Sequence, residues 1–283
     1  MLKEGNVVVE WMFSGLYRWE RSGAQVTFLT YDGIRVPKIW APVYSDDNSL
    51  TTGNPTVIII GGQHLDEVHS TGLLLRQPQV FNCLRRRFNL LIYPVINQSG
   101  LSFPHDSGIR LLREDDYSHN YNSFWGFRFF KKATEVFLVE DDIIKNIKQG
   151  TNVVAAISFH SDSELPYQGY VFIDKWDEWS IQQYRQTVET HTTIRPFLRT
   201  ASNQPYTGNG QLRDGWIIVN YQDIDQPGSF ENWMNTLRTP TLVIEAPHGV
   251  SPEIEMEFSQ VMIEALAQIL PKITSEYNTN ASP

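Results

Sequence analysis

Short runs of continuous apolar residues constrain the fold of this chain more than any other feature. Residues 56–60 read Thr-Val-Ile-Ile-Ile and are followed at once by Gly61 and Gly62. A strand without a polar face has to be covered on both sides, as the central strands of parallel sheets are. Similar runs occur at residues 90–96, 153–159, 170–173, 216–219 and 241–244. The chain is therefore predicted to build a central sheet that is buried between two layers.

Longer amphipathic segments between these runs supply the covering layers. Apolar residues recur with helical periodicity at residues 66–87, 135–148, 177–193 and 252–272. Pro78 should interrupt the first of these helices, and Asp32-Gly33 predicts a hairpin turn within residues 24–41. Strands that alternate with helices indicate an α/β fold with a largely parallel or mixed sheet. No repeat or linker divides the sequence, so residues 1–283 are predicted to form one domain, with a frayed tail over residues 276–283.

Composition argues against several classes of function. Hydrophobic residues make up 41% of the 283 residues, which is enough for a full core. The net charge of -9 disfavours a nucleic-acid-binding or anionic-membrane-binding surface. The single cysteine, Cys83, cannot form an internal disulfide. The sequence has neither the pattern of a secretory signal nor a run of transmembrane length, so a cytoplasmic protein is expected.

Two of the apolar runs end in residues that can bind a metal. His64 and Glu67 follow the first run, three positions apart at the expected start of a helix, so both side chains can reach one ion. This H-x-x-E spacing is common, and a helix-start Glu beside an incidental His also explains it. His160 ends the run at residues 153–159. Together the three side chains are a ligand set typical of catalytic zinc, at strand ends where ligand sites collect.

A carboxylate ends a third apolar run. Glu245 follows residues 241–244. Burying a charged group at such a place is costly, which favours a functional reason for its presence. Beside a zinc-activated water, this carboxylate would act as a general base.

These motifs, in this order, resemble the zinc carboxypeptidase family of carboxypeptidase A-like metallopeptidases, to which the aspartoacylase and succinylglutamate desuccinylase branch is closely related. The resemblance covers residues 55–250. It implies a three-layer α/β/α sandwich around a mixed, mostly parallel sheet. It also implies one zinc ion per chain, held by His64, Glu67 and His160, with Glu245 as the catalytic base.

The same resemblance implies roles for residues between these motifs. Residues 97–100, Asn-Gln-Ser-Gly, are similar to the family's N-P-x-G turn, and Arg110 and Arg113 are similar to its paired arginines. The second arginine polarises the scissile carbonyl, so Arg113 is expected to stabilise the oxyanion. Asn122 and Tyr221 match positions that place the substrate. Residues 228–233 are similar to the pocket-lining loop after the tyrosine segment.

The predicted substrate pocket departs from the family pattern at two positions. Ser123 stands where an arginine normally clamps the terminal carboxylate of the substrate, and Asn120 replaces an Asp that orients a zinc-binding histidine. A serine supplies neither the charge nor the forked geometry of an arginine. Weak discrimination for a free C-terminal carboxylate is therefore expected, unless another cation enters the pocket. The candidates are Arg110, Arg128 and Arg213, of which Arg213 is favoured.

Three functions are compatible with these motifs. A zinc-dependent metallocarboxypeptidase acting on a peptide or peptide-like substrate is favoured by the arginine pair and by Tyr221. An N-acyl amino-acid deacylase of the aspartoacylase type would apply the same chemistry to short acylated amino acids. A zinc-binding protein without catalysis is disfavoured because Glu245 and Arg113 are both present beside the ligand set.

Overall fold

The computed structural model describes residues 5–44, 54–64, 68–97, 125–126, 134–162, 166–174, 176–200, 211–212, 215–219 and 228–280. The elements follow in the order α1 (Gly5–Arg21), β1 (Gln25–Tyr31), β2 (Ile34–Ala41), β3 (Thr56–Ile60), α2 (Val68–Arg76), η1 (Pro78–Phe81), α3 (Asn82–Arg85), β4 (Asn89–Tyr93), α5 (Thr134–Lys148), β5 (Val153–Asp162), β6 (Tyr170–Asp174), α6 (Glu178–Glu189), η5 (Arg195–Phe197), β7 (Gln211–Leu212), β8 (Ile217–Val219), α7 (Phe230–Thr236), β9 (Thr241–Pro247) and α8 (Pro252–Asn280). Among these residues no helix combines the length and apolarity needed to cross a membrane.

The strands form one sheet in the order β1-β2-β4-β3-β5-β9-β6-β8-β7. The four central strands, β4, β3, β5 and β9, are parallel to one another. On either side of this block the pairing turns antiparallel, between β2 and β4 and between β6 and β9. Every residue of β3 and β4 is buried, as the continuous apolar runs require. The predicted mixed, mostly parallel sheet is confirmed.

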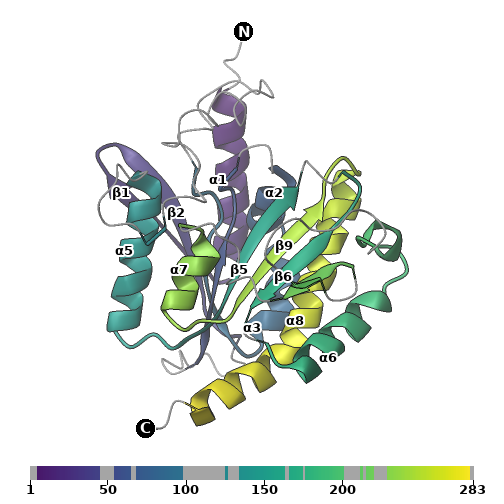
Figure 1. Cartoon of the computed structure of the whole chain (residues 1–283). Helices are drawn as coiled ribbons and strands as arrows, with labels where there is room; N and C mark the ends of the chain where they lie inside the picture. The colour runs from purple at the N-terminus through teal and green to yellow at the C-terminus, as the bar shows by residue number, and fades with distance from the viewer. Residues whose placement is uncertain are drawn as a thin grey trace.

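The sheet lies between two helical layers (Figure 1), with α5 and α7 on one face and α8 on the other. Strand β3 shows why both layers are needed, because its side chains alternate between two hydrophobic cores. Val57 and Ile59 belong to the core that α1, α2, α6 and α8 complete. Ile58 and Ile60 belong to the core beneath α5 and α7. The predicted three-layer α/β/α sandwich is confirmed.

The hairpin at the start of the sheet forms where it was predicted. Tyr31 pairs with Ile34, which leaves Asp32 and Gly33 as a two-residue turn. Their φ angles are 46° and 80°. A hairpin turn of this kind needs positive φ at both central residues, and Asp-Gly tolerates that conformation best. Strand β2 then continues into the sheet beside β4.

The helices agree with the predicted ranges in most places. Pro78 ends the helical stretch at residues 66–87 as expected, since α2 stops at Arg76 and a short 3-10 turn begins at the proline. Helix α8 continues to Asn280, beyond the predicted end at residue 272, with Pro271 inside it.

Two helices were not predicted from the sequence. Helix α1 has Trp19 fully buried, and its indole Nε1–H donates to the carbonyl of Leu74 at 2.6 Å, which fixes α1 to α2. Helix α7 occupies the segment expected to be a pocket-lining loop. Its N-cap is Ser229, whose hydroxyl accepts the backbone N–H of Asn232 at 3.1 Å.

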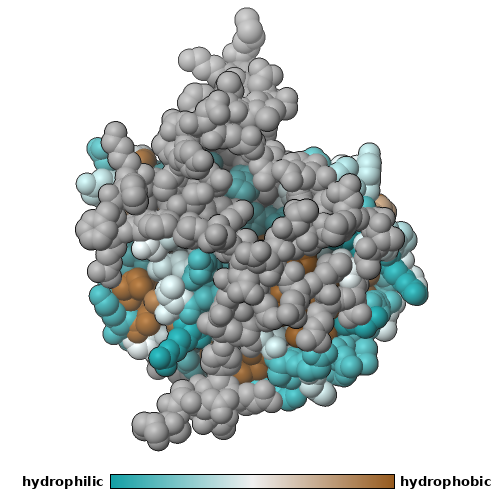
Figure 2. Space-filling view, in the orientation of Figure 1, coloured by the Kyte–Doolittle hydropathy of each residue, from teal (hydrophilic) through white to brown (hydrophobic). Residues whose placement is uncertain are grey.

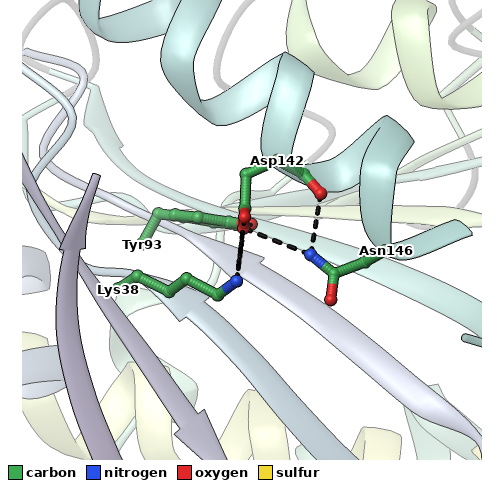
Figure 3. Close-up of polar contacts among 4 residues, drawn as sticks. All are labelled: Lys38, Tyr93, Asp142 and Asn146. Carbon is green, nitrogen blue, oxygen red and sulfur yellow. Dashed lines mark hydrogen bonds and ion pairs between the residues drawn. The ribbon is translucent and has the colours of Figure 1, made fainter. Parts of the chain in front are cut away.

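A polar cluster joins α5 to the sheet inside the second core (Figure 3). Asp142 lies 2.7 Å from the ammonium of Lys38 on β2 and accepts the hydroxyl of Tyr93 on β4 at 2.6 Å. Asn146, one turn along α5, donates to the backbone carbonyl of Asp142 at 2.7 Å. Burial, followed by the negative charge of Asp142, raises the pKa of Tyr93 well above its ordinary value. The carboxylate therefore has partners on two different strands.

Removing this carboxylate should loosen α5. Asp142→Ala leaves Lys38 and Tyr93 without their shared acceptor, so we expect the free energy of unfolding to fall by about 2–4 kcal/mol. Asp142→Asn keeps an oxygen that can accept from Tyr93 and should lose about half as much. Urea denaturation at neutral pH measures both variants. Equal losses for the two would contradict the assigned role of the charge.

A second buried tyrosine predicts how stability depends on pH. Tyr184 on α6 is completely buried, and its hydroxyl donates to the sulfur of Met262 at 3.1 Å. Burial raises the pKa of Tyr184 well above its ordinary value of 10.0. Because the folded pKa lies above the unfolded pKa, the stabilising effect is complete below about pH 10 and is lost as the pH rises further.

Replacing this phenol should therefore have opposite consequences at neutral and alkaline pH. At pH 7, Tyr184→Phe loses one weak hydrogen bond and should cost no more than about 1 kcal/mol. Above about pH 10, the variant should gain stability relative to the wild type, since it has no phenol to keep protonated. Urea denaturation of both proteins at the two pH values checks this. A stability difference that does not change with pH would contradict it.

Candidate metal centre

The carboxyl ends of the parallel strands bring the predicted metal and catalytic residues to one edge of the sheet. His160 on β5 and Glu245 on β9 are register partners. Neighbouring residues in register leave a sheet on the same face, so the imidazole and the carboxylate lie side by side. Ala156, which precedes His160 on the same face of β5, belongs to the core beneath α5 and α7. The candidate centre therefore opens on that face.

The loop after β3 carries His64 and is shaped by its two glycines. A Cβ on Gly61 would collide with a methyl carbon of Leu74 on α2, which would have to shift to admit any larger residue. Gly62 has a φ of 61°, a conformation that favours glycine. Asn97, after β4, donates its backbone N–H to the carbonyl of Gly62 at 2.9 Å and its amide to that of Gln63 at 3.2 Å. These bonds tie the loop to the segment that follows β4.

The two histidine rings lie next to each other. Their centroids are 5.4 Å apart and the ring planes meet at 53°. Two imidazoles at this separation can share one zinc ion, since each Zn–N bond is about 2.0–2.1 Å long. His160 is only 3% exposed, whereas His64 is half-buried, so the solvent reaches the pair mainly at His64. Two of the three predicted zinc ligands, His64 and His160, are therefore close enough to bind the same ion.

The third predicted ligand, Glu67, lies outside the residues that the structure describes. Within the described ranges, no group of three or more His, Cys, Asp or Glu side chains could hold a metal ion. His64 and His160 are thus the part of the predicted triad that the structure brings together, and the assignment of Glu67 stays a prediction.

Behind His160 lies a set of buried polar side chains. The hydroxyl of Ser158 is 2.7 Å from His160 Nε2, and the amide nitrogen of Gln63 is 3.1 Å from the same atom. Gln63 Nε2 also donates to Ser158 Oγ at 3.2 Å, and Gln63 Oε1 accepts the indole N–H of Trp125 at 3.0 Å. These contacts fix the plane of the His160 ring. Histidine ligands of metals are commonly oriented by an outer shell of this kind.

Glu245 is the one residue of β9 that is not fully buried. It lies between His160 on the neighbouring strand β5 and Tyr170 on the neighbouring strand β6, with which it is also in register. A carboxylate held in a rigid strand beside His160 is placed to take a proton from a water molecule near that imidazole. Its position fits the predicted general base.

The remaining predicted site residues lie outside the described ranges. They are Arg110, Arg113, Asn122, Ser123, Arg213 and Tyr221. Their assignments, and that of Arg128 as a further candidate cation, stay predictions.

Three residues of the centre were missed by sequence reasoning. Ser158 carried a usable signal, because it precedes His160 by two positions and so projects from the same face of the strand. Gln63 stands directly before His64, but nothing in its neighbourhood indicates a contact with β5. Trp125 comes from a segment far from both histidines in the sequence. Its bond to Gln63 could be found only in three dimensions.

A buried cation near the centre was also missed. The Arg199 guanidinium is 5.3 Å from the ring centre of Tyr170, and the side chain is 3% exposed. Tyr170 is the register partner of Glu245. A positive charge therefore lies beside the strand that neighbours the catalytic candidate.

Comparison with solved structures gives the same fold. A candidate metallopeptidase of Shewanella amazonensis matches with a TM-score of 0.68 at 17% identity, covering 93% of each chain. A metallo-carboxypeptidase of Burkholderia cenocepacia matches with a TM-score of 0.60 at 16% identity, covering 92% of this chain and 68% of the other. Carboxypeptidase A of Helicoverpa armigera matches with a TM-score of 0.54 at 12% identity, covering 94% and 72%.

This chain therefore has the fold of the metallo-carboxypeptidases. No protein-family profile and no curated protein matches its sequence. At these identities the similarity shows the fold alone, so any assignment of activity depends on the residues of the centre.

Removing one histidine tests the centre directly. Wild-type protein should bind one zinc per chain, and His160→Ala should weaken zinc binding by more than about 100-fold, because the remaining ligands hold the ion poorly. His191→Ala, after the end of α6, is the matched control and should bind as the wild type does. Metal analysis after dialysis and competition with a chromophoric chelator measure this. Unchanged affinity in His160→Ala would refute the ligand assignment.

Proposed function

We propose that this chain is a zinc-dependent, metallocarboxypeptidase-like hydrolase that cleaves an amide bond of a peptide or peptide-like substrate. One observation carries the proposal. His64 and His160 lie with their rings 5.4 Å apart, and Glu245 is in register with His160 at the carboxyl edge of the sheet. Two imidazoles and a strand-borne carboxylate in this order support metal-assisted hydrolysis. The fold shared with metallo-carboxypeptidases favours peptides as the class of substrate.

His64 and His160 would hold the proposed zinc, with Glu67 as the third ligand. When bound, it would supply Lewis-acid activation of the attacking water and of the scissile carbonyl. Glu245 accepts the proton of the water and later delivers it to the nitrogen of the leaving amine. The β5–β9 pairing fixes how His160 and Glu245 lie relative to each other, because both side chains project from paired strands. Arg113 stabilises the oxyanion in this scheme.

The proposed substrate differs from that of an ordinary carboxypeptidase. Arg110, Asn122 and Tyr221 would position it, but Ser123 supplies no charged fork for a terminal carboxylate. A modified or branched peptide, or a small amino-acid conjugate, fits such a pocket better than a peptide with a free C-terminus. Arg213 is the proposed alternative cation.

A conservative change separates metal binding from catalysis. Glu245→Gln keeps the shape and hydrogen bonding of the side chain but removes the base, so zinc should stay bound while kcat falls by about 10²–10⁴-fold. The control is Glu178→Gln, at the exposed start of α6. Turnover is measured on three substrate sets: peptides with a free terminal carboxylate, the same peptides amidated, and N-acyl amino acids.

Each alternative function has its own outcome in this assay. Hydrolysis confined to N-acyl amino acids would assign the deacylase function instead. Zinc binding with no turnover of any substrate would favour the non-catalytic protein. Equal kcat values for wild type and Glu245→Gln would remove Glu245 from the mechanism.

A further inference from the structure

Strand β1 ends the sheet on the side away from the candidate centre. It is the first strand in the order of the sheet and pairs with β2 on its inner side. Among the described residues, no strand pairs with its outer side. Thr27, Thr30 and Tyr31 of this strand are exposed. A row of backbone donors and acceptors therefore faces outward at this edge.

The hairpin fixes which backbone groups point outward. Tyr31 and Ile34 close the two-residue turn, so they form a hydrogen-bonded pair. Such pairs alternate along an antiparallel ladder with pairs that share no hydrogen bond, and Phe28 belongs to the second kind. Its register partner is Pro37, which has no N–H to donate, as this position requires. By the same alternation, the outward N–H and C=O groups are those of Val26, Phe28 and Thr30.

The side chains of β1 do not protect this edge from pairing. Natural edge strands are commonly protected by charged side chains, by proline or by a β-bulge. Residues 25–31 read Gln-Val-Thr-Phe-Leu-Thr-Tyr, with neither a charge nor a proline. Their register with β2 runs through all seven residues without a shift. Most of these residues are β-branched or aromatic, which suits them to pair with a further strand.

An exposed aromatic flank of α1 lies beside the same edge. Phe13 is 45% exposed, and its ring packs against that of Phe28 with a centroid distance of 6.2 Å. Tyr17, one turn further along α1, is 60% exposed. Arg35 on β2 lies over the Phe28 ring, 4.4 Å from its centre. Exposed aromatic side chains next to outward backbone groups favour a protein as the partner at this surface.

We propose that β1 is a dimer interface, at which it pairs antiparallel with β1 of a second copy of this chain about a two-fold axis at Phe28. Phe28 is the middle residue of the strand, so this axis sets Phe28 opposite itself and Val26 opposite Thr30. Every outward N–H then meets an outward C=O of the other copy. The Phe13 and Phe28 rings of both copies come together at the axis and bury their exposed surface.

Charge complementarity favours a second copy in this direction. Antiparallel pairing about Phe28 brings Asp32, in the hairpin turn, opposite Ala24 of the other copy. Ala24 is bonded to the last turn of α1, where Arg21 is exposed. Opposite charges therefore approach each other at both ends of the paired strands. Parallel pairing would instead bring Asp32 beside Asp32 and Arg21 beside Arg21.

A proline at an outward position tests the pairing. Thr30→Pro removes a donor that β2 does not use and places a ring in the path of the partner strand, so the dissociation constant of the dimer should rise at least about 10-fold. Thr30→Val is the matched control, because it removes the same hydroxyl but keeps the N–H, and it should dimerise as the wild type does. Analytical ultracentrifugation of the full chain over a range of concentrations measures association, and thermal unfolding shows which variants are folded.

Amide hydrogen exchange followed by NMR tests the pairing residue by residue. The N–H groups of Val26, Phe28 and Thr30 should be protected at concentrations where the chain is dimeric and should exchange rapidly on dilution. Those of Thr27 and Leu29 bond to β2 in either state and should stay protected throughout.

A double-mutant cycle tests the direction of pairing. Asp32→Asn keeps the turn, since Asn-Gly adopts the same backbone, and removes the charge, so the dimer should weaken about 2–10-fold. In the background of Arg21→Gln, the same change should have no further effect. Equal effects of Asp32→Asn in both backgrounds would overturn the antiparallel register.

The dimer itself has separate ways to fail. A wild type that is monomeric at every concentration overturns the proposal. A folded Thr30→Pro variant that dimerises as the wild type does also overturns it, because the interface then lies elsewhere, and so does exchange at Phe28 that is the same in monomer and dimer. None of these substitutions touches the candidate metal centre, so the outcome is independent of the proposed hydrolase function.

Discussion

The parallel pairing of β5 with β9 is the constraint on which the rest of the candidate centre depends. It sets His160 beside Glu245, two groups that are far apart in the sequence and have no other reason to meet. A slip of one residue would place Phe159 opposite Glu245 and turn one of the two functional side chains to the other face. The register is protected because a slip of β5 by one residue would turn Ser158 and His160 toward the apolar core to which Phe159 now belongs.

Polar groups inside this sheet are tolerated because they are grouped. In the core beneath α5, Asp142 accepts hydrogen bonds from Lys38 and Tyr93. Gln63 accepts a hydrogen bond from Trp125 and donates one to Ser158. An isolated buried donor or acceptor costs more than one that is paired. Both groups lie on the same face of the sheet, under the helices α5 and α7 that Figure 1 shows. Hydrophilic and hydrophobic residues are interspersed over the coloured parts of the surface in Figure 2, which has the same orientation. On the opposite face, Ile59, Ile92 and Ile157 of the three neighbouring strands β3, β4 and β5 belong to the apolar core.

The sequence predicts the parts of the structure that depend on local patterns. Residues 56–60 could be assigned to a doubly covered strand because four of the five side chains are valine or isoleucine, and the Asp32-Gly33 turn because few dipeptides adopt its backbone. His64, His160 and Glu245 could be placed at one edge because parallel strands end together. The sequence did not predict helix α7 because a serine such as Ser229 is equally compatible with a loop and with a helix N-cap. The contact between Trp125 and Gln63 joins distant segments, and no local pattern records it.

The shape and the charge of the centre are set by different parts of the chain. Rigid strands, and the loop that Asn97 holds by two hydrogen bonds, fix where the histidines lie. The sequence indicates these features through its strand ends and glycines. The polar groups in contact with His160 Nε2 come instead from a hydroxyl and an amide, those of Ser158 and Gln63. The indole of Trp125 can only donate, so it turns the carbonyl oxygen of Gln63 toward itself. Two chains could share this fold and both histidines and still differ in the groups that surround the rings, which is why likeness of fold alone does not assign the chemistry of the centre.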